Sequence, residues 1–168
     1  MRLLNIRGYF GDATRPDLLE TAGIDEVELF VIAIDDRERV IELVRHVKSH
    51  YPGLKLMVRA FDQVHLYQLK QAGADFIFKE TYHSALDMGC NALHQLGFDW
   101  NRAEDLKNTF IETEDETGDA LYQNWLATSG SGIRQGFRDL FMQQETRLRE
   151  AMQHEMDDDE DQRSEKPD

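Results

Sequence analysis

The apolar residues of this chain follow two spacings in turn, one typical of buried strands and the other typical of helices. Short apolar runs without strict alternation are how strands read when both faces of a parallel sheet are covered. Helical segments instead repeat their apolar residues every three or four positions. The expected strands are residues 27–34, 54–58 and 76–78, and the expected helices between and after them are residues 37–50, 62–73 and 81–96. This strand–helix alternation predicts an α/β fold with a parallel sheet.

The expected helices have identifiable ends and apolar faces. Asp12 or Thr14 is expected to cap a first short helix that Gly23 ends. Asp35 or Asp36 can cap the next helix, and Asp62 caps the one after it. For the helix at 37–50 the expected buried face is Val40, Ile41, Leu43, Val44 and Val47. For the helix at 81–96 the expected inward residues are Ala85, Leu86, Met88, Ala92, Leu93 and Leu96.

The pattern changes at Gly97, after which no strand is expected. We therefore divide the chain into an α/β region at residues 1–97, a helical C-terminal extension at 98–154 and an acidic tail at 155–168 that we expect to be disordered. Within the extension, Gly118 is a weak point of a helix, and residues 128–136 form a glycine-rich loop.

Composition narrows the classes of function. The 168 residues carry a formal net charge of −14. Residues 155–168 contribute −6 of this charge, because they hold eight acidic and two basic side chains. Such a surface repels nucleic acid and anionic lipid, so we expect no nucleic-acid partner. The one cysteine excludes an internal disulfide, and no apolar run approaches the roughly 18 residues of a membrane helix.

Polar side chains follow the expected strands where ligands bind in open α/β sheets. Asp12 follows a short apolar run at residues 8–10, Asp35 follows the strand at 27–34, and Arg59 follows a third strand. A carboxylate at this edge can accept hydrogen bonds from a ribose or an adenine amine, and a guanidinium can hold a phosphate. Structural roles remain open: the aspartates can be helix caps, and Arg59 can form an ion pair with Asp62 or Asp36. No catalytic constellation or metal-ligand set stands out beside them.

The order of several motifs carries a resemblance. GDATRPDLLETAGI, then VIAIDD, VRAFD, LKQAGA and KETYHSAL resemble the second half of a TrkA-N (RCK/KTN) nucleotide-binding domain, over roughly residues 8–100. The cytosolic domains of Kef-type glutathione-regulated potassium-efflux antiporters are the most similar. The resemblance implies a partial Rossmann-like sheet. Because no G-x-G-x-x-G occurs in these 168 residues, we expect half of such a domain, and a small complete α/β domain is the alternative.

The resemblance also implies binding residues. The expected contacts to NAD(H) or AMP are Asp12, Ala13, Thr14, Asp35, Asp36 and Arg59, and those to a glutathione-like ligand are Asp62, Lys79 and Glu80. We expect nucleotide binding to be weak or absent without the glycine-rich motif. Glutathione binding should be weak or absent as well, because Lys79 stands where the family has an arginine and an ammonium lacks its two-pronged grip.

The implied function is regulatory and non-enzymatic: gating of potassium/proton efflux in response to ligand. The implied partners are a second copy, meeting near Leu93, Leu96, Phe98 and Trp100, the membrane domain of a transporter, and a flavoprotein ancillary subunit. The implied location is cytoplasmic, at the cytosolic face of the inner membrane. Two other classes remain open: a nucleotide-dependent Rossmann-type oxidoreductase, and a stand-alone interaction module built on the helices after Gly97.

Overall fold

The computed structural model describes residues 10–12 and 14–128, together with the single positions 138, 142, 145, 146 and 149. Most of the expected glycine-rich loop and the whole acidic tail lie outside these residues. The short apolar run at residues 8–10, also read as a strand, lies outside them too, except for Phe10, which is fully exposed and in no strand. The chain divides into two compact units, Met1–Thr81 and Tyr82–Asp168, described separately below. The division into regions at 97 and 154 stays a prediction.

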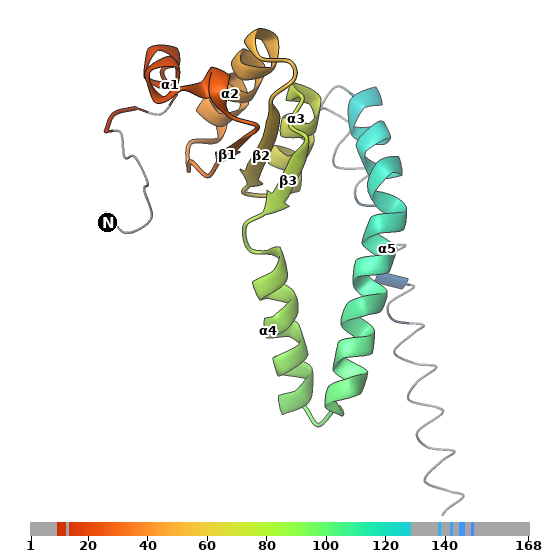
Figure 1. Cartoon of the computed structure of the whole chain (residues 1–168). Helices are drawn as coiled ribbons and strands as arrows, with labels where there is room; N and C mark the ends of the chain where they lie inside the picture. The colour runs from red at the N-terminus through yellow and green to blue at the C-terminus, as the bar shows by residue number, and fades with distance from the viewer. Residues whose placement is uncertain are drawn as a thin grey trace, which may run out of the picture. The chain divides into compact units, whose positions relative to one another are not determined.

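The first unit has an α/β fold with a parallel sheet, as the sequence pattern predicted (Figure 1). In chain order its elements are α1 (Pro16–Ala22), the 3₁₀ turn η1 (Ile24–Glu26), β1 (Leu29–Ile32), α2 (Arg37–His50), β2 (Lys55–Ala60), α3 (Gln63–Ala72) and β3 (Phe76–Lys79). The described strands pair in the order β1-β2-β3, all parallel. Ile32 lies opposite Val58, and Ala60 lies opposite Lys79. The carboxyl ends of the strands therefore meet at one edge of the sheet.

Local sequence explains where most of these helices begin and end. The side chain of Asp36 caps α2 by accepting the backbone N–H of Arg39 at 3.2 Å, and Asp62 caps α3 by accepting that of His65 at 2.8 Å. Gly23 and Gly73 end α1 and α3 in the left-handed conformation, with φ of 86° and 102°. One expected cap is wrong: α1 starts after Arg15, and no side chain caps it.

One face of the sheet carries the core. The expected apolar face of α2 is confirmed, and it packs in one cluster with Ile32, Leu56 and Val58. The alternate strand residues face the other way and are exposed: Leu29, Val31, Phe76 and Phe78. Our expectation of strands buried on both faces is therefore wrong for the residues that the structure describes. The pattern identified side chains suited to burial, but no described element of the first unit covers the second face.

A polar junction joins α2 to the sheet. The carboxylate of Asp75 accepts the backbone N–H of Leu56 and the Lys48 ammonium, each at 2.7 Å. Lys48 also donates to the carbonyl oxygen of Leu54 at 2.9 Å, and its side chain is largely buried. The segment that precedes β3 is thus connected to the middle strand, β2, and to the helix α2 through the side chain of Asp75.

The second unit contains the helices α4 (Tyr82–Gln95) and α5 (Trp100–Ala127), which pack against each other (Figure 1). Asp99 caps α5, which continues unbroken through Gly118. The buried residues are Cys90, Ala103, Leu106 and Leu121. Most of the residues expected to face inward on α4 do not: Met88 is 71% and Leu96 77% exposed, while the neighbouring Cys90 is buried and donates to the carbonyl of Ala103. Apolar residues lie around much of α4, so their spacing could not tell which face α5 covers.

Candidate functional site

Arg59 joins the carboxyl ends of the three described strands. It is the next-to-last residue of β2, and its Nη1 donates to Oε1 of Glu80 at 2.9 Å, just past the end of β3. Its Nη2 donates to the carboxylate of Asp35, which follows β1. The position of Arg59 agrees with our expectation that it lies at this edge. Its ion-pair partners are Glu80 and Asp35, however, and not Asp62 or Asp36, the two partners that the sequence suggested. Both charged arms of the guanidinium are thus occupied within the first unit.

A second arginine lies beside this cluster, on the first turn of α2. Arg37 donates to Asp62 at 2.8 Å, and its guanidinium carbon lies 3.8 Å from the ring centre of Phe61. The backbone N–H of Phe61 donates to Nδ1 of His65 at 3.1 Å. Burial lowers the pKa of the His65 imidazole, against the opposing effect of the Asp62 carboxylate, so the ring is neutral at pH 7. The loop after β2 is therefore fixed by both of its neighbouring helices.

These two arginines border a cavity of about 180 Å³. Its lining consists of Ile34, Asp35, Arg37, Arg59, Phe61, His65 and Glu80. Side chains of both charges line the cavity together with two apolar residues, Ile34 and Phe61. A larger hollow of about 790 Å³ lies at the opposite edge, where the strands begin, and includes Leu29, Lys55 and Phe76. We place the candidate site in the smaller cavity, because ligands of open α/β sheets bind beyond the carboxyl ends of the strands.

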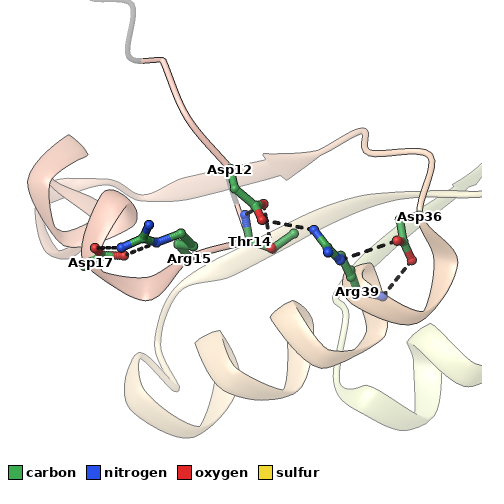
Figure 2. Close-up of polar contacts among 6 residues, drawn as sticks. All are labelled: Asp12, Thr14, Arg15, Asp17, Asp36 and Arg39. Atoms are coloured by element: carbon green, nitrogen blue, oxygen red, sulfur yellow. Dashed lines mark hydrogen bonds and ion pairs between the residues drawn. The ribbon is translucent and has the colours of Figure 1, made fainter.

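Asp12 belongs to a separate cluster, drawn in Figure 2. Its carboxylate accepts the Thr14 hydroxyl at 2.6 Å and the Thr14 backbone N–H at 3.0 Å. These bonds, with the Arg39 guanidinium 3.0 Å away, lower the pKa of the Asp12 carboxyl. Arg39 also approaches Asp36, at 3.5 Å. A further exposed ion pair in the same view joins Arg15 to Asp17 (Figure 2).

The aspartates expected to contact a nucleotide therefore form ion pairs with two different arginines. Asp12 and Asp36 contact Arg39, whereas Asp35 contacts Arg59, although Asp35 and Asp36 are neighbours in sequence. Ala13 lies outside the described residues. The three residues expected for a glutathione-like ligand also divide: Asp62 contacts Arg37, Glu80 contacts Arg59, and Lys79 is the last residue of β3.

The residues that sequence reasoning missed are Arg37, Arg39, Phe61 and His65. A signal for the two arginines existed, because cations are disfavoured near the N-terminus of a helix. Two arginines in the first turn of α2, following a strand, indicate that carboxylates are close enough to compensate. Nothing comparable marked Phe61 or His65, whose placement depends on how the loop after β2 packs.

Two negative findings apply to the described part of the chain. It contains no group of three or more histidine, cysteine, aspartate or glutamate side chains placed to hold a metal ion. Among its helices, none combines the length and the apolar character needed to cross a membrane.

Comparison with known proteins identifies the family. The family model of the TrkA-N domain matches residues 2–80, and that of the potassium efflux system KefB C-terminal domain matches residues 84–166. A solved Kef C-terminal domain of Shewanella denitrificans, in an AMP-bound form, is 38% identical, with a TM-score of 0.65 over 70% of this chain and 74% of that one. This chain belongs to the Kef C-terminal domain family.

Other relatives of this Kef-family chain agree. The glutathione-regulated potassium-efflux system protein KefC of Klebsiella pneumoniae is 40% identical over 110 residues, and that of Salmonella arizonae is 39% identical. These matches cover 66% of this chain but 18% of the KefC proteins. The solved RCK domain of GsuK is 26% identical, with a TM-score of 0.50 over 58% of this chain and 22% of that one. The Kef resemblance and the Rossmann-like RCK fold expected from the sequence are confirmed.

Proposed function

We propose that this chain is a ligand-binding regulatory portion of a Kef-type potassium/proton efflux antiporter. In this proposal a nucleotide, AMP or NAD(H), binds at the carboxyl edge of the sheet and changes the gating of a transporter domain. The observation that carries it is the meeting of three strand ends at Arg59, beside a cavity of about 180 Å³. The AMP-bound state of the Shewanella relative supports a nucleotide as the ligand.

Each expected residue receives a role in this proposal. Arg59 holds a phosphate group, and Asp35, which also lines the cavity, contacts the ribose or the base. Asp12, Ala13, Thr14 and Asp36 do not line this cavity and are proposed as further contacts to the same ligand. The charges of the cavity suit a ligand that carries both an anion and hydrogen-bond donors. Binding is weak, because the 168 residues contain no G-x-G-x-x-G to bring backbone N–H groups to a pyrophosphate.

Calorimetric titration with AMP tests the nucleotide site. Arg59→Lys should weaken AMP binding roughly tenfold, because an ammonium replaces a two-pronged hydrogen-bond donor to phosphate. The matched control is Arg45→Lys, on the exposed face of α2 away from the cavity, which should leave the affinity unchanged. Equal affinities in the two variants would contradict the role of Arg59. A sub-micromolar dissociation constant for NADH would contradict the expectation of weak nucleotide binding.

A glutathione-like ligand is the second part of the proposal. Asp62 and Glu80 are candidates for holding its amine and Lys79 for its carboxylate, and binding is weak or absent because Lys79 is a point charge. Titration of the chain with glutathione and a bulky S-conjugate tests this. If both ligands bind at micromolar concentrations and Lys79→Ala abolishes this binding, then Lys79 performs the role of the arginine that the family has at this position.

We further propose that the chain is non-enzymatic and acts as a homodimer attached to the transporter at the cytosolic face of the inner membrane, with a flavoprotein as a possible ancillary subunit. The exposed apolar side chains of Met88, on α4, and of Leu96, directly after α4, support a dimer contact that also includes Leu93, Phe98 and Trp100. Light scattering should show a dimer that Leu96→Asp dissociates, whereas Gln95→Asp, an exposed polar position on the same helix, should not. Turnover of nicotinamide cofactors would favour the oxidoreductase alternative.

A further inference from the structure

The guanidinium that faces the candidate site already has carboxylate partners. Arg59 Nη1 contacts Glu80 at 2.9 Å and Nη2 contacts Asp35, and the Arg59 side chain is only 27% exposed. A guanidinium presents five N–H donors in a fixed planar fork, so a phosphate that spans Nη1 and Nη2 competes with these carboxylates for the same edge and the same positive charge. A two-pronged contact with an incoming anion is therefore opposed by the protein's own carboxylates.

The two partners of Arg59 differ in how firmly they are held. The side chain of Asp35 is 96% exposed and follows β1 in a loop, so water can replace its contact with Arg59 at little cost. The side chain of Glu80 is 38% exposed, and its backbone N–H donates to the carbonyl oxygen of Ala60 at 2.9 Å, next to Arg59 in the chain. Glu80 is thereby fixed at the end of β3, within reach of the guanidinium.

We infer that Glu80 is an internal competitor of the ligand: its carboxylate occupies the arm of Arg59 that an anionic group of the ligand would take. This inference rests on the proposed nucleotide function and adds an inhibitory contact to that same site. The ligand exchanges one ion pair for another, which lowers its affinity compared with a site in which Arg59 is unoccupied. Because partly exposed ion pairs contribute about 0.2–1 kcal/mol, the competition weakens anion binding by roughly 1.4- to 5-fold.

The opposite role for Glu80 is a direct contact with an amine of the ligand. The two roles predict opposite effects of removing the carboxylate. Under competition, Glu80→Gln strengthens the binding of anions through Arg59. Under direct contact, it weakens the binding of any ligand that carries the amine, whether or not that ligand carries an anion.

The experiment is calorimetric titration with three probes: AMP, adenosine, which lacks the phosphate, and inorganic phosphate. For Glu80→Gln we expect AMP and phosphate to bind roughly 1.4- to 5-fold more tightly, with the affinity for adenosine unchanged. Glu38→Gln is the matched control, because Glu38 is exposed in the first turn of α2 and loses the same charge without a contact to Arg59. It should change AMP binding much less.

A second variant separates the ion pair from the net charge. Glu80→Asp keeps the negative charge but shortens the side chain by one methylene, which removes the 2.9 Å contact with Arg59. It should also tighten AMP and phosphate, and it remains informative if the glutamine variant does not fold. In an Arg59→Ala background neither change at Glu80 should alter phosphate binding.

The outcomes separate this inference from the proposed function. Binding of AMP that Glu80→Gln weakens or leaves unchanged would overturn the competition and leave the nucleotide site in place. The Glu80 variants could instead bind phosphate more tightly, in a way that depends on Arg59, while no variant binds AMP. That result would support the competition and overturn the nucleotide proposal. No difference between Glu80→Gln and Glu38→Gln with any probe would overturn the inference.

Discussion

Asp75 offers the sharpest test of how the first unit is held together. Its carboxylate accepts the backbone N–H of Leu56 and the ammonium of Lys48, both at 2.7 Å. A hydrogen bond to a charged group contributes about 1.5–3 kcal/mol when the donor is shielded from water. Since the Asp75 side chain is 37% exposed, solvent screening limits the Lys48 pair to roughly 1 kcal/mol or less. We expect Asp75→Ala to lower the free energy of unfolding by about 2–3 kcal/mol.

Asp75→Asn refines this prediction. The amide keeps an oxygen that can accept from Leu56 but loses the charge that attracts Lys48, so the expected cost is about 1 kcal/mol. In a double-mutant cycle with Lys48→Met, the cost of Asp75→Asn should shrink, since its ionic partner is already absent. Glu42→Ala, at an exposed position of α2, is the control and should change stability by less than about 0.5 kcal/mol.

Hydrogen exchange of the Leu56 amide is the appropriate measurement. Both tryptophans of the chain, Trp100 and Trp125, lie in the second unit, so tryptophan fluorescence does not report on this sheet. The Leu56 amide donates directly to Asp75 and should lose protection in proportion to the free energy lost. A cost of Asp75→Ala no larger than that of Glu42→Ala would refute the reasoning.

The same group sets a pH dependence. Burial alone would raise the pKa of the Asp75 carboxyl, but the bonds from Lys48 and from the Leu56 N–H outweigh it and lower that pKa below its ordinary 3.8. The stabilisation is therefore complete above pH 3.8 and is lost as the pH falls through the folded-state pKa. Asp75→Asn should remove this part of the acid dependence and leave the remainder unchanged.

Three further predictions concern other elements. Gly73→Ala should cost about 1–2 kcal/mol in unfolding free energy, measured by urea denaturation followed by circular dichroism, because φ is 102° and a Cβ would lie 3.3 Å from Lys48 Cγ. Asp62→Ala should cost about 1–2 kcal/mol by the same assay through loss of the α3 cap, and Asp62→Asn should cost less, since asparagine also caps helices. Burial, and then the Glu114 carboxylate, raise the pKa of the Tyr82 phenol. In an alkaline absorbance titration Tyr82 should therefore ionise at higher pH than a tyrosine of ordinary pKa, and Glu114→Gln should bring its ionisation to lower pH.

Much of the first unit could be read from sequence because its signals are local. The apolar spacing of α2 identified all five of its buried residues, since only one face of that helix is apolar. Asp62 and Gly73 could be assigned to helix ends, and the cap of α2 could be narrowed to Asp35 or Asp36, because a cap depends on a side chain or a φ angle within a few residues. The parallel order of the strands followed from the helices between them.

The pairing of charges at the candidate site could not be read in this way. Asp35 and Asp36 are adjacent, yet one contacts Arg59 and the other Arg39, because the loop that follows β1 bends at Asp35, just before α2 begins at Arg37. Glu80 meets Arg59 through the register that places Ala60 opposite Lys79. The sequence itself determined which side chains stand at the carboxyl ends of the strands. The tertiary structure decided which arginine each carboxylate contacts and which apolar faces are covered, because these depend on elements that are distant in the chain.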